Sequence, residues 1–168
     1  MFSQPEADHL MFSVQKHRTS TILHAGPTHG DAITIELQSP EVPEESFVLD
    51  INRKYRVIDL HVLPIMQLRT RSSCQLVRLE IDPRAKRHRN PDGAWVEGPH
   101  IHVFTEGFGM LWAHPLEPTR LAQFMIDNPE TPRFMFPSWN IGSAKTVWDE
   151  LLPWIKVVTP PLVDFPIF

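Results

Sequence analysis

Proline is the residue that most limits what this chain can fold into. The sequence holds 17 prolines among 168 residues, which is about twice the usual share of roughly 5%. Proline fixes its own φ angle and lacks a backbone N–H, so it interrupts helices and central strands. The sequence therefore predicts short elements joined by many turns.

The stretches between the prolines alternate apolar and polar residues, which is the pattern of half-buried strands. We expect an antiparallel meander of strands over residues 32–37, 47–53, 56–61, 65–69, 75–82, 95–96 and 100–105. Two helices follow, one over residues 118–128 and one from Ser143 to about Pro153. Strands first and helices afterwards indicate an α+β fold, in which about two C-terminal helices pack on one face of the sheet.

One domain is expected over residues 1–168, because a chain of this length can bury enough surface for one core. Residues 1–30 predict a flexible or loosely packed arm, and residues 155–168 predict a Pro-rich tail. No stretch approaches the ~18 apolar residues of a membrane span. The N-terminus carries an acidic pair where a signal peptide needs basic residues. These features favour a cytoplasmic protein without a membrane partner.

The most site-like feature is the strand His100-Ile101-His102. Residues two apart in a strand point to the same side, so alternation separates a core row from an opposite, polar face. On the strands at 75–82 and 100–105, the core row contains Val77, Leu79, Ile81, Ile101 and Val103. The opposite face then contains Arg78, Glu80, Asp82, His100 and His102. If the two strands pair, the histidines lie beside the charged side chains, and Asp50, Gln67 and Arg69 extend the same face.

Two imidazoles at this spacing can bind a divalent metal if a third ligand converges on them. Glu106 follows at a suitable distance along the chain, so the candidate metal ligands are His100, His102 and Glu106. Other potential ligands within reach are Glu80, Asp82 and His88.

The same histidines can instead act as an acid–base pair, because the imidazole pKa lies near neutrality. In that interpretation the catalytic residues are His100 and His102, with Arg78 binding an anionic substrate and His88 in support. The residues expected to contact substrate are Gln67, Arg69, Arg89 and Asn90. The structural alternative is a hydrogen-bonded pair of histidines without catalytic role.

A basic run precedes the histidines. It contains Arg84, Lys86, Arg87, His88 and Arg89, and it ends in the turn sequence Asn90-Pro91-Asp92-Gly93. The run is either a solvated loop or a lip that collects phosphate groups beside the histidines. The net charge of −4 argues against a protein that coats nucleic acid nonspecifically, so a contact with RNA would be local.

Several segments together resemble a family of small uncharacterised bacterial and phage proteins with the signature HxNPDG followed by GPHxHxF. These segments are Val77–Ile81, His88–Gly93, Gly98–Phe104 and Trp112-Ala113. The chain departs from the family pattern at Glu80, where Asp is expected, and its basic loop is longer. This resemblance implies no particular activity.

Two further resemblances concern pattern only. A strand with Arg78 and Glu80 followed by paired histidines is similar to small toxin endoribonucleases of toxin–antitoxin modules. The spacing of His100, His102 and Glu106 is similar to the first metal motif of cupins, although no His after His114 supplies the second motif.

The sequence therefore favours a phosphodiesterase or ribonuclease-like enzyme that acts on RNA or a nucleotide through paired histidines on a sheet. A competing interpretation is a non-catalytic phage or mobile-element protein that binds a host protein through its acidic surface and Pro-rich tail. A third is a cupin-like metal-binding protein. Oligomeric state does not follow from any of these features.

Overall fold

The computed structural model describes residues 2–19, 32–52, 65–137 and 139–163. The N-terminal elements are α1 (Gln4–Asp8), η1 (His9–Ser13, a π-helical turn), β1 (Lys16–Arg18), β2 (Ala32–Gln38), β3 (Ser46–Asn52), β4 (Ile65–Thr70) and β5 (Gln75–Glu80). The later elements are β6 (His88–Arg89), β7 (Trp95–Val96), β8 (His100–Val103), β9 (Ala113–Pro115), α2 (Pro118–Asp127), α3 (Ala144–Trp154) and β10 (Val157–Thr159). The expected α+β class is confirmed. The strand expected over residues 56–61 lies outside the described residues.

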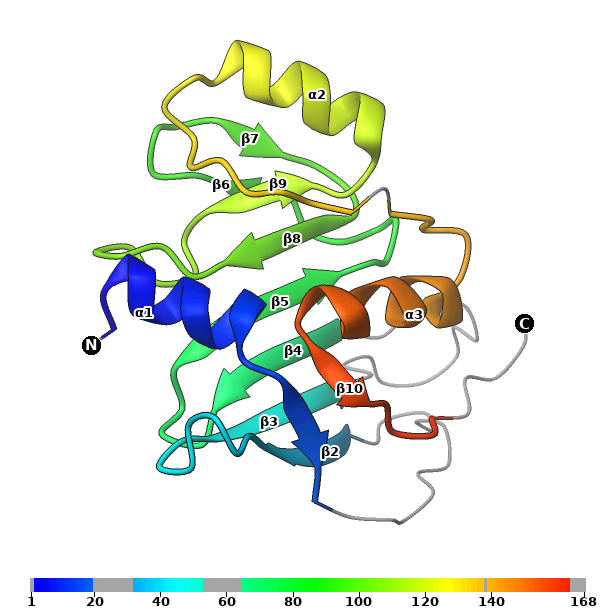
Figure 1. Ribbon diagram of the computed structural model, residues 1–168. Helices are drawn as coiled ribbons and strands as arrows, with labels where there is room; N and C mark the ends of the chain where they lie inside the picture. The colour runs from blue at the N-terminus through cyan, green and yellow to red at the C-terminus, as the bar shows by residue number, and fades with distance from the viewer. Residues whose placement is uncertain (1, 20–31, 53–64, 138, 164–168) are drawn as a thin grey trace.

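Within the described residues, eight strands form one sheet in the order β10-β1-β2-β3-β4-β5-β8-β9, and β6 and β7 form a separate hairpin. Neighbouring strands in the sheet are antiparallel, except that β1 and β10 run parallel. Figure 1 shows this meander from β2 to β9, with α1 and α3 in front of it. The sheet is open, with β10 and β9 at its edges, whereas a cupin would need a double-sheet barrel.

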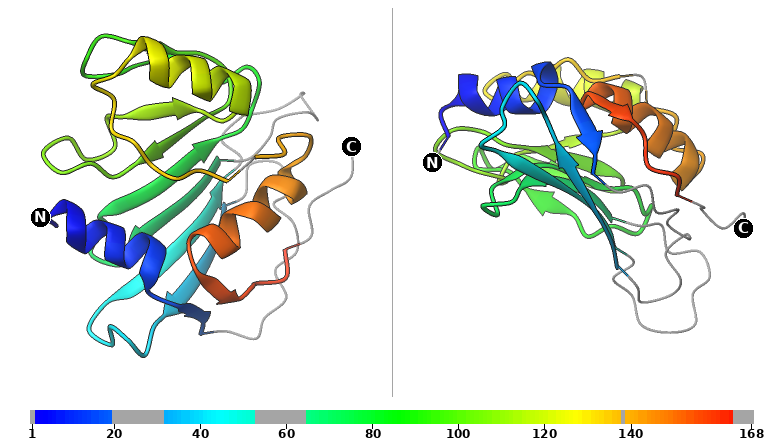
Figure 2. Two further views of the ribbon diagram at one scale, coloured as in Figure 1. Left: turned by 45° about the horizontal axis from the view of Figure 1, so that its top comes forward. Right: turned by 60° about the horizontal axis from the view of Figure 1, so that its bottom comes forward.

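The hydrophobic core lies between the sheet and the helices that cover one of its faces, which are α1, η1 and α3 (Figure 2). Strand register aligns apolar residues in rows on this face. One row consists of consecutive cross-strand partners Leu49, Leu68, Val77 and Val103, each at most 1% exposed. Because side chains alternate along each strand, the polar residues between these positions point to the opposite face.

The prediction of a flexible or loosely packed arm over residues 1–30 is wrong for residues 2–19, which fold onto the core. Ser3 caps α1 and forms a capping box with Glu6. The next apolar residues follow helical spacing and are at most 7% exposed; they are Ala7, Leu10, Met11 and Val14. Residues 20–31 lie outside the described part of the chain.

Lys16 connects the N-terminal helix to the C-terminal one. It is fully buried, and its ammonium donates hydrogen bonds to the carbonyl oxygens of Met11 (3.2 Å), Val14 (3.0 Å) and Ile155 (2.8 Å). These carbonyls lie at the C-terminal ends of η1 and α3, where helical partners are missing. Burial lowers the pKa of Lys16 to about 7, and the three oxygens are the partners that a buried ammonium needs.

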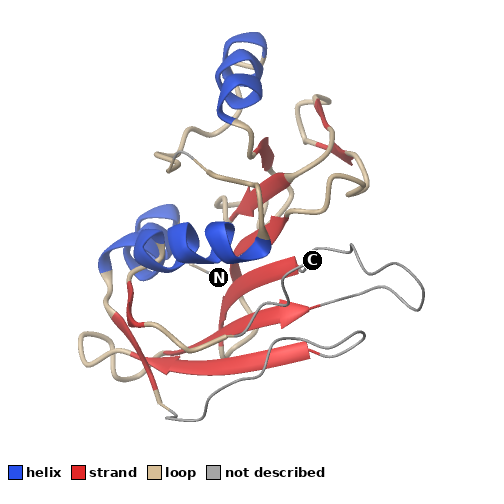
Figure 3. Ribbon diagram, turned by 90° about the vertical axis from the view of Figure 1, so that its right-hand side faces the viewer, coloured by secondary structure: helices blue, strands red, loops and turns tan. Residues whose placement is uncertain are grey.

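The two expected C-terminal helices are present but pack differently. Ser143 caps α3 as predicted, and one face of α3 is buried in the core. In contrast, α2 has no buried residue and lies beside β9 at the end of the molecule (Figures 1 and 3). The expected tail starts later than residue 155, because Ile155 and Val157 are buried and residues 157–159 form β10. None of the described helices is long and apolar enough to span a membrane.

Candidate metal centre

The cross-strand pairing predicted around the His-x-His strand is confirmed. Strand β8 pairs with β5 so that His102 lies opposite Arg78 and His100 lies opposite Glu80. The row that contains His102 and Arg78 continues across β4, β3 and β2 through Gln67, Asp50 and Thr34. These five residues form what we call the polar row. It lies on the sheet face opposite the core, because its members alternate with the buried apolar rows.

Both histidines of β8 are held by backbone carbonyl groups. His100 is 1% exposed and His102 is 4% exposed. Nδ1 of His100 lies 2.7 Å from the carbonyl oxygen of Gly98, and Nδ1 of His102 lies 2.9 Å from that of Met110. A carbonyl oxygen only accepts hydrogen bonds, so each Nδ1 carries the proton and donates it. Each Nε2 therefore keeps an unprotonated lone pair.

A carboxylate completes a cluster with these two rings. One ligand atom from each of Glu80, His100 and His102 lies within 4.8 Å of the others, and within the described residues this is the one such group of three. The Glu80 carboxylate also forms an ion pair with Arg78. The side chains of Glu80 and Arg78 are 18% and 31% exposed, so the cluster reaches solvent on their side. Two imidazoles and one carboxylate are a common ligand set of catalytic zinc.

A third imidazole lies beside this cluster. The β6–β7 hairpin lies on the side of the sheet away from α1 and α3 (Figure 3). It brings the His88 ring to 4.7 Å from the His102 ring and 6.3 Å from the His100 ring, measured between ring centroids. Nε2 of His88 donates to the carbonyl oxygen of Leu111 at 2.7 Å, so Nδ1 of His88 keeps a lone pair.

Asn90 attaches the hairpin to the sheet edge. Its side-chain Nδ2 donates to the carbonyl oxygen of Ala113 at 3.0 Å, and its Oδ1 accepts from the Ala113 N–H at 2.9 Å. The turn chemistry expected here is confirmed, since the Gly93 N–H donates to the Asn90 carbonyl at 2.9 Å and Gly93 has a φ of 93°. The Asn90 amide, expected to contact substrate, is thus occupied in holding the hairpin against β9.

Burial dominates the titration of the β8 histidines. It lowers the pKa of His100, and the hydrogen bond to Gly98 and the charge of Glu80 partly oppose this effect. Burial lowers the pKa of His102 to about 3, with further lowering from His100 and His88. Both rings are therefore neutral at pH 7, as metal ligands must be. An acid–base pair would instead need one ring to hold a proton near neutrality.

With the geometry established, comparison with known proteins places the chain in a family. The model of DUF6978, a family of unknown function, matches residues 2–132. The chain belongs to DUF6978. The matched region contains Glu80, His88, His100 and His102 and ends before α3. Comparisons with curated proteins and with solved structures find no match. DUF6978 membership therefore brings no activity with it, and the chemistry has to be argued from the cluster itself.

Glu106, which sequence spacing suggested as a ligand, lies elsewhere in this DUF6978 fold. It is exposed in the turn between β8 and β9. Its carboxylate accepts a hydrogen bond from the Gln4 N–H at 3.0 Å, and its own N–H donates to Gln4 Oε1 at 2.9 Å. Glu106 therefore ties this turn to α1. Glu80 is the carboxylate beside the histidines, and the signal for it was the alternation along β5.

The other residues expected at the site are distributed around it. Gln67 lies in the polar row between Asp50 and Arg78. Arg69 donates from Nε to the Asp50 carboxylate at 2.7 Å, so it forms an ion pair one strand away from the cluster. Arg89 is exposed on the outer side of the hairpin. Of the residues predicted as catalytic, the structure brings together Arg78, His88, His100 and His102.

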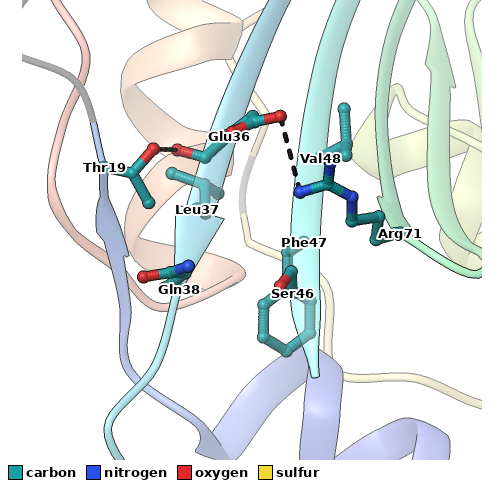
Figure 4. A pocket seen from close by; sticks show the side chains of 8 residues that line it. All are labelled: Thr19, Glu36, Leu37, Gln38, Ser46, Phe47, Val48 and Arg71. Atoms are coloured by element: carbon teal, nitrogen blue, oxygen red, sulfur yellow. Dashed lines mark hydrogen bonds and ion pairs between the residues drawn. The ribbon is translucent and has the colours of Figure 1, made fainter. Parts of the chain in front are cut away.

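Two hollows lie near β1 and β2, away from the cluster of Glu80, His100 and His102. The smaller holds about 10 Å³ between β2 and β3, and Figure 4 shows the Arg71–Glu36 ion pair (3.7 Å) beside it. This volume suffices for about one water molecule. The larger, of about 560 Å³, borders β1 and the turn after β2, and its lining contains no carboxylate or thiol. Neither hollow combines space with a cluster of catalytic groups.

Proposed function

We propose that this protein is a metal-dependent hydrolase of phosphodiester bonds, with one divalent ion such as Zn²⁺ bound by Glu80, His100 and His102. The observation that carries the proposal is the convergence of one carboxylate and two imidazoles within 4.8 Å. Three protein ligands leave a fourth coordination position for water, which distinguishes catalytic zinc sites from closed structural ones.

The surroundings of the two rings support this assignment. Histidines that bind metal generally donate the other ring N–H to a carbonyl or carboxylate, which fixes the ring and raises its basicity. His100 and His102 both do so, toward Gly98 and Met110. These carbonyls belong to separate loops on either side of β8. The backbone therefore holds both Nε2 atoms ready for a ligand before any ion arrives.

His88 and Arg78 supply the remaining chemistry. A bound divalent ion makes water nucleophilic at neutral pH. The water oxygen bonds to phosphorus as the bond from phosphorus to one ester oxygen breaks. His88 takes the proton that water loses on Nδ1 and returns it to the leaving oxygen. Arg78 lies beside Glu80 and offers its guanidinium to the non-bridging phosphate oxygens.

An anionic substrate fits the distribution of charge around the cluster. The chain as a whole has a net charge of −4, yet cations are concentrated in β6 and in the loop that precedes it. These cations are Arg84, Lys86, Arg87 and Arg89, of which Arg84 forms an ion pair with Asp82. A local concentration of positive charge raises the concentration of anionic substrates beside the cluster.

Hydrolysis of bis(p-nitrophenyl) phosphate tests the proposal. Protein stripped with EDTA should be inactive and should regain activity with Zn²⁺ or Mn²⁺. His102→Ala should lose both metal affinity and activity. His88→Gln should keep the metal but lower kcat by about 100-fold or more, because a general base contributes 10²–10⁴-fold. Glu106→Gln is the matched control and should behave as wild type.

Two results would contradict the proposal. One is a wild-type protein that binds metal but hydrolyses neither this ester nor a dinucleotide, which would support the non-catalytic interpretation. The other is an EDTA-stripped protein that retains full activity, which would support the metal-independent acid–base pair.

A further inference from the structure

The outer face of the β6–β7 hairpin carries side chains that the metal chemistry does not use. Arg89 pairs with Trp95 across the hairpin, and His88 pairs with Val96. Since neighbouring residues of a strand face opposite sides, the hairpin has two different faces. His88 points to the histidine cluster and Val96 is buried, whereas Arg89 is exposed and Trp95 is 48% exposed.

Cations gather around the exposed indole. The guanidinium of Arg87 lies 4.3 Å from the centroid of the Trp95 ring, and that of Arg89 lies 5.9 Å from it. Lys86 is exposed immediately before Arg87. We call these four residues, Lys86, Arg87, Arg89 and Trp95, the outer hairpin surface. It combines a flat aromatic group with two guanidinium groups that lie over its ring.

We propose that the outer hairpin surface binds single-stranded nucleic acid, with Trp95 stacking on an unpaired base and Arg87 and Arg89 contacting the adjacent phosphates. Stacking of a base on an aromatic ring needs a nucleic acid whose bases are unpaired. A guanidinium group can donate two parallel hydrogen bonds to two oxygens of one phosphate. The binding itself does not depend on the proposed function. That this strand is also the substrate does rest on it.

Two features favour this occupant over an acidic protein segment. An acidic peptide would satisfy the cations but offers no flat group for the indole, while a nucleotide offers both a base and a phosphate. The hairpin also links the surface to the cluster, because His88 and Arg89 are neighbours on β6 and face opposite sides. A nucleic acid bound to the outer hairpin surface is therefore separated from the proposed metal centre by the β6–β7 hairpin.

Fluorescence anisotropy with labelled single strands of RNA or DNA of about 12 nucleotides tests the proposal, since site sizes of this kind span about 4–16 nucleotides. EDTA-stripped protein is used, so that the strand is not cleaved. We expect binding that weakens between about 50 and 200 mM salt. Trp95→Ala should weaken it about tenfold, and Trp95→Phe should restore most of the loss. Arg87→Ala and Arg89→Ala should each reduce the salt dependence.

Matched controls come from other exposed positions. Met135→Ala removes a side chain that is 93% exposed, and Lys145→Ala removes an exposed cation of α3. Both should bind like wild type. Absence of binding by the intact protein, or equal binding by Trp95→Ala, would overturn the proposal. Equal or tighter binding of duplex DNA or of a polyglutamate peptide would also overturn it.

Nucleic-acid binding by the outer hairpin surface can be tested separately from hydrolysis by the proposed metal centre. Strand binding without hydrolysis of the small ester would leave the outer hairpin surface assigned and the enzyme proposal refuted. Hydrolysis of the small ester without strand binding would do the reverse. Trp95→Ala should keep wild-type zinc affinity, because Trp95 lies on the face of the hairpin away from the cluster.

Discussion

Glu80 and Glu106 are two carboxylates that sequence and structure rank differently as ligands. Glu106 is nearer to the histidines along the chain, but Glu80 is their neighbour across the sheet. We expect Glu80→Gln to weaken Zn²⁺ binding by at least about 100-fold, because even the groups behind metal ligands contribute 10–100-fold. Glu106→Gln should leave the affinity unchanged. Competition with a chromogenic chelator measures both, and equal affinities for the two variants would contradict the ligand assignment.

His114 is a buried histidine outside the cluster. It is 0% exposed on the core side of β9, and neither of its ring nitrogens has a hydrogen-bond partner in the described part of the chain. The rings of Phe134 and Phe136 pack against it, with centroids at 5.6 and 5.0 Å. Burial lowers the pKa of His114 from 6.5 to about 4. His114 is therefore neutral in the folded protein at pH 7.

This lowered pKa makes stability depend on pH. In the unfolded chain His114 binds a proton near pH 6.5, whereas in the folded protein it does so only near pH 4. Titration of His114 therefore leaves the free energy of unfolding unchanged above pH 6.5. As the pH falls from 6.5 to 4, protonation of His114 in the unfolded chain lowers the free energy of unfolding by about 3 kcal/mol. Urea unfolding measures the free energy of unfolding at pH 7 and at pH 4. The decrease between these two pH values should be smaller for His114→Leu than for wild type by about this amount. Equal losses in wild type and variant would contradict the prediction.

At the scale of elements, Lys16 joins η1, α3 and β1. Replacing it with Met leaves three buried carbonyl oxygens without a donor, and each such group costs about 1–3 kcal/mol. We expect Lys16→Met to lower the free energy of unfolding by about 3 kcal/mol in total, since Met restores some apolar packing. Lys145→Met, at an exposed cation of α3, should change it by less than about 0.5 kcal/mol. Chemical denaturation measures both, and a Lys16→Met protein as stable as wild type would contradict this role.

The hairpin depends on Asn90 in a comparable way. Asn90→Ala removes both side-chain hydrogen bonds to Ala113, which should cost about 2 kcal/mol. Hydrogen exchange should show a less protected Ala113 amide, because Asn90 Oδ1 is its acceptor. Asn128→Ala removes a single hydrogen bond at the end of α2 and should leave the Ala113 amide unchanged. Unaltered exchange at Ala113 in Asn90→Ala would contradict the attachment.

The elements also show what could be predicted and what could not. Alternation along β5 and β8 predicted which residues share a face, and pairing of consecutive strands then placed Glu80 and Arg78 beside the histidines. Alternation alone did not place the hairpin over the cluster, because that position depends on the contact between Asn90 and Ala113. It also did not exclude Glu106, since closeness along the chain cannot replace register across the sheet.

The N-terminal arm was mispredicted for a physical reason. Its polar residues suggested exposure. Lys16 is nevertheless buried, and one of its hydrogen-bond acceptors is the carbonyl oxygen of Ile155, 139 residues away. No local pattern contains that information. Two local signals were nevertheless present: the capping box of Ser3 and Glu6, and the helical spacing of Ala7, Leu10, Met11 and Val14.

For the whole molecule, the two faces of the sheet have different roles. One face buries its apolar rows under α1, η1 and α3 and supplies the core. The other carries the polar row and the histidine cluster. The β6–β7 hairpin lies on the same side (Figure 3). The core side can therefore stabilise the fold while the opposite face holds polar groups in fixed positions, as a preorganised site requires.

A zinc K-edge X-ray absorption spectrum tests the proposed binding of one divalent ion by Glu80, His100 and His102. Protein with one equivalent of Zn²⁺ should show imidazole scattering from two histidines and a nitrogen or oxygen shell at about 2.0–2.2 Å. The His100→Ala/His102→Ala double variant should lose the imidazole features. Failure to retain zinc at that stoichiometry, or a wild-type spectrum without imidazole scattering, would contradict this assignment of the metal ligands.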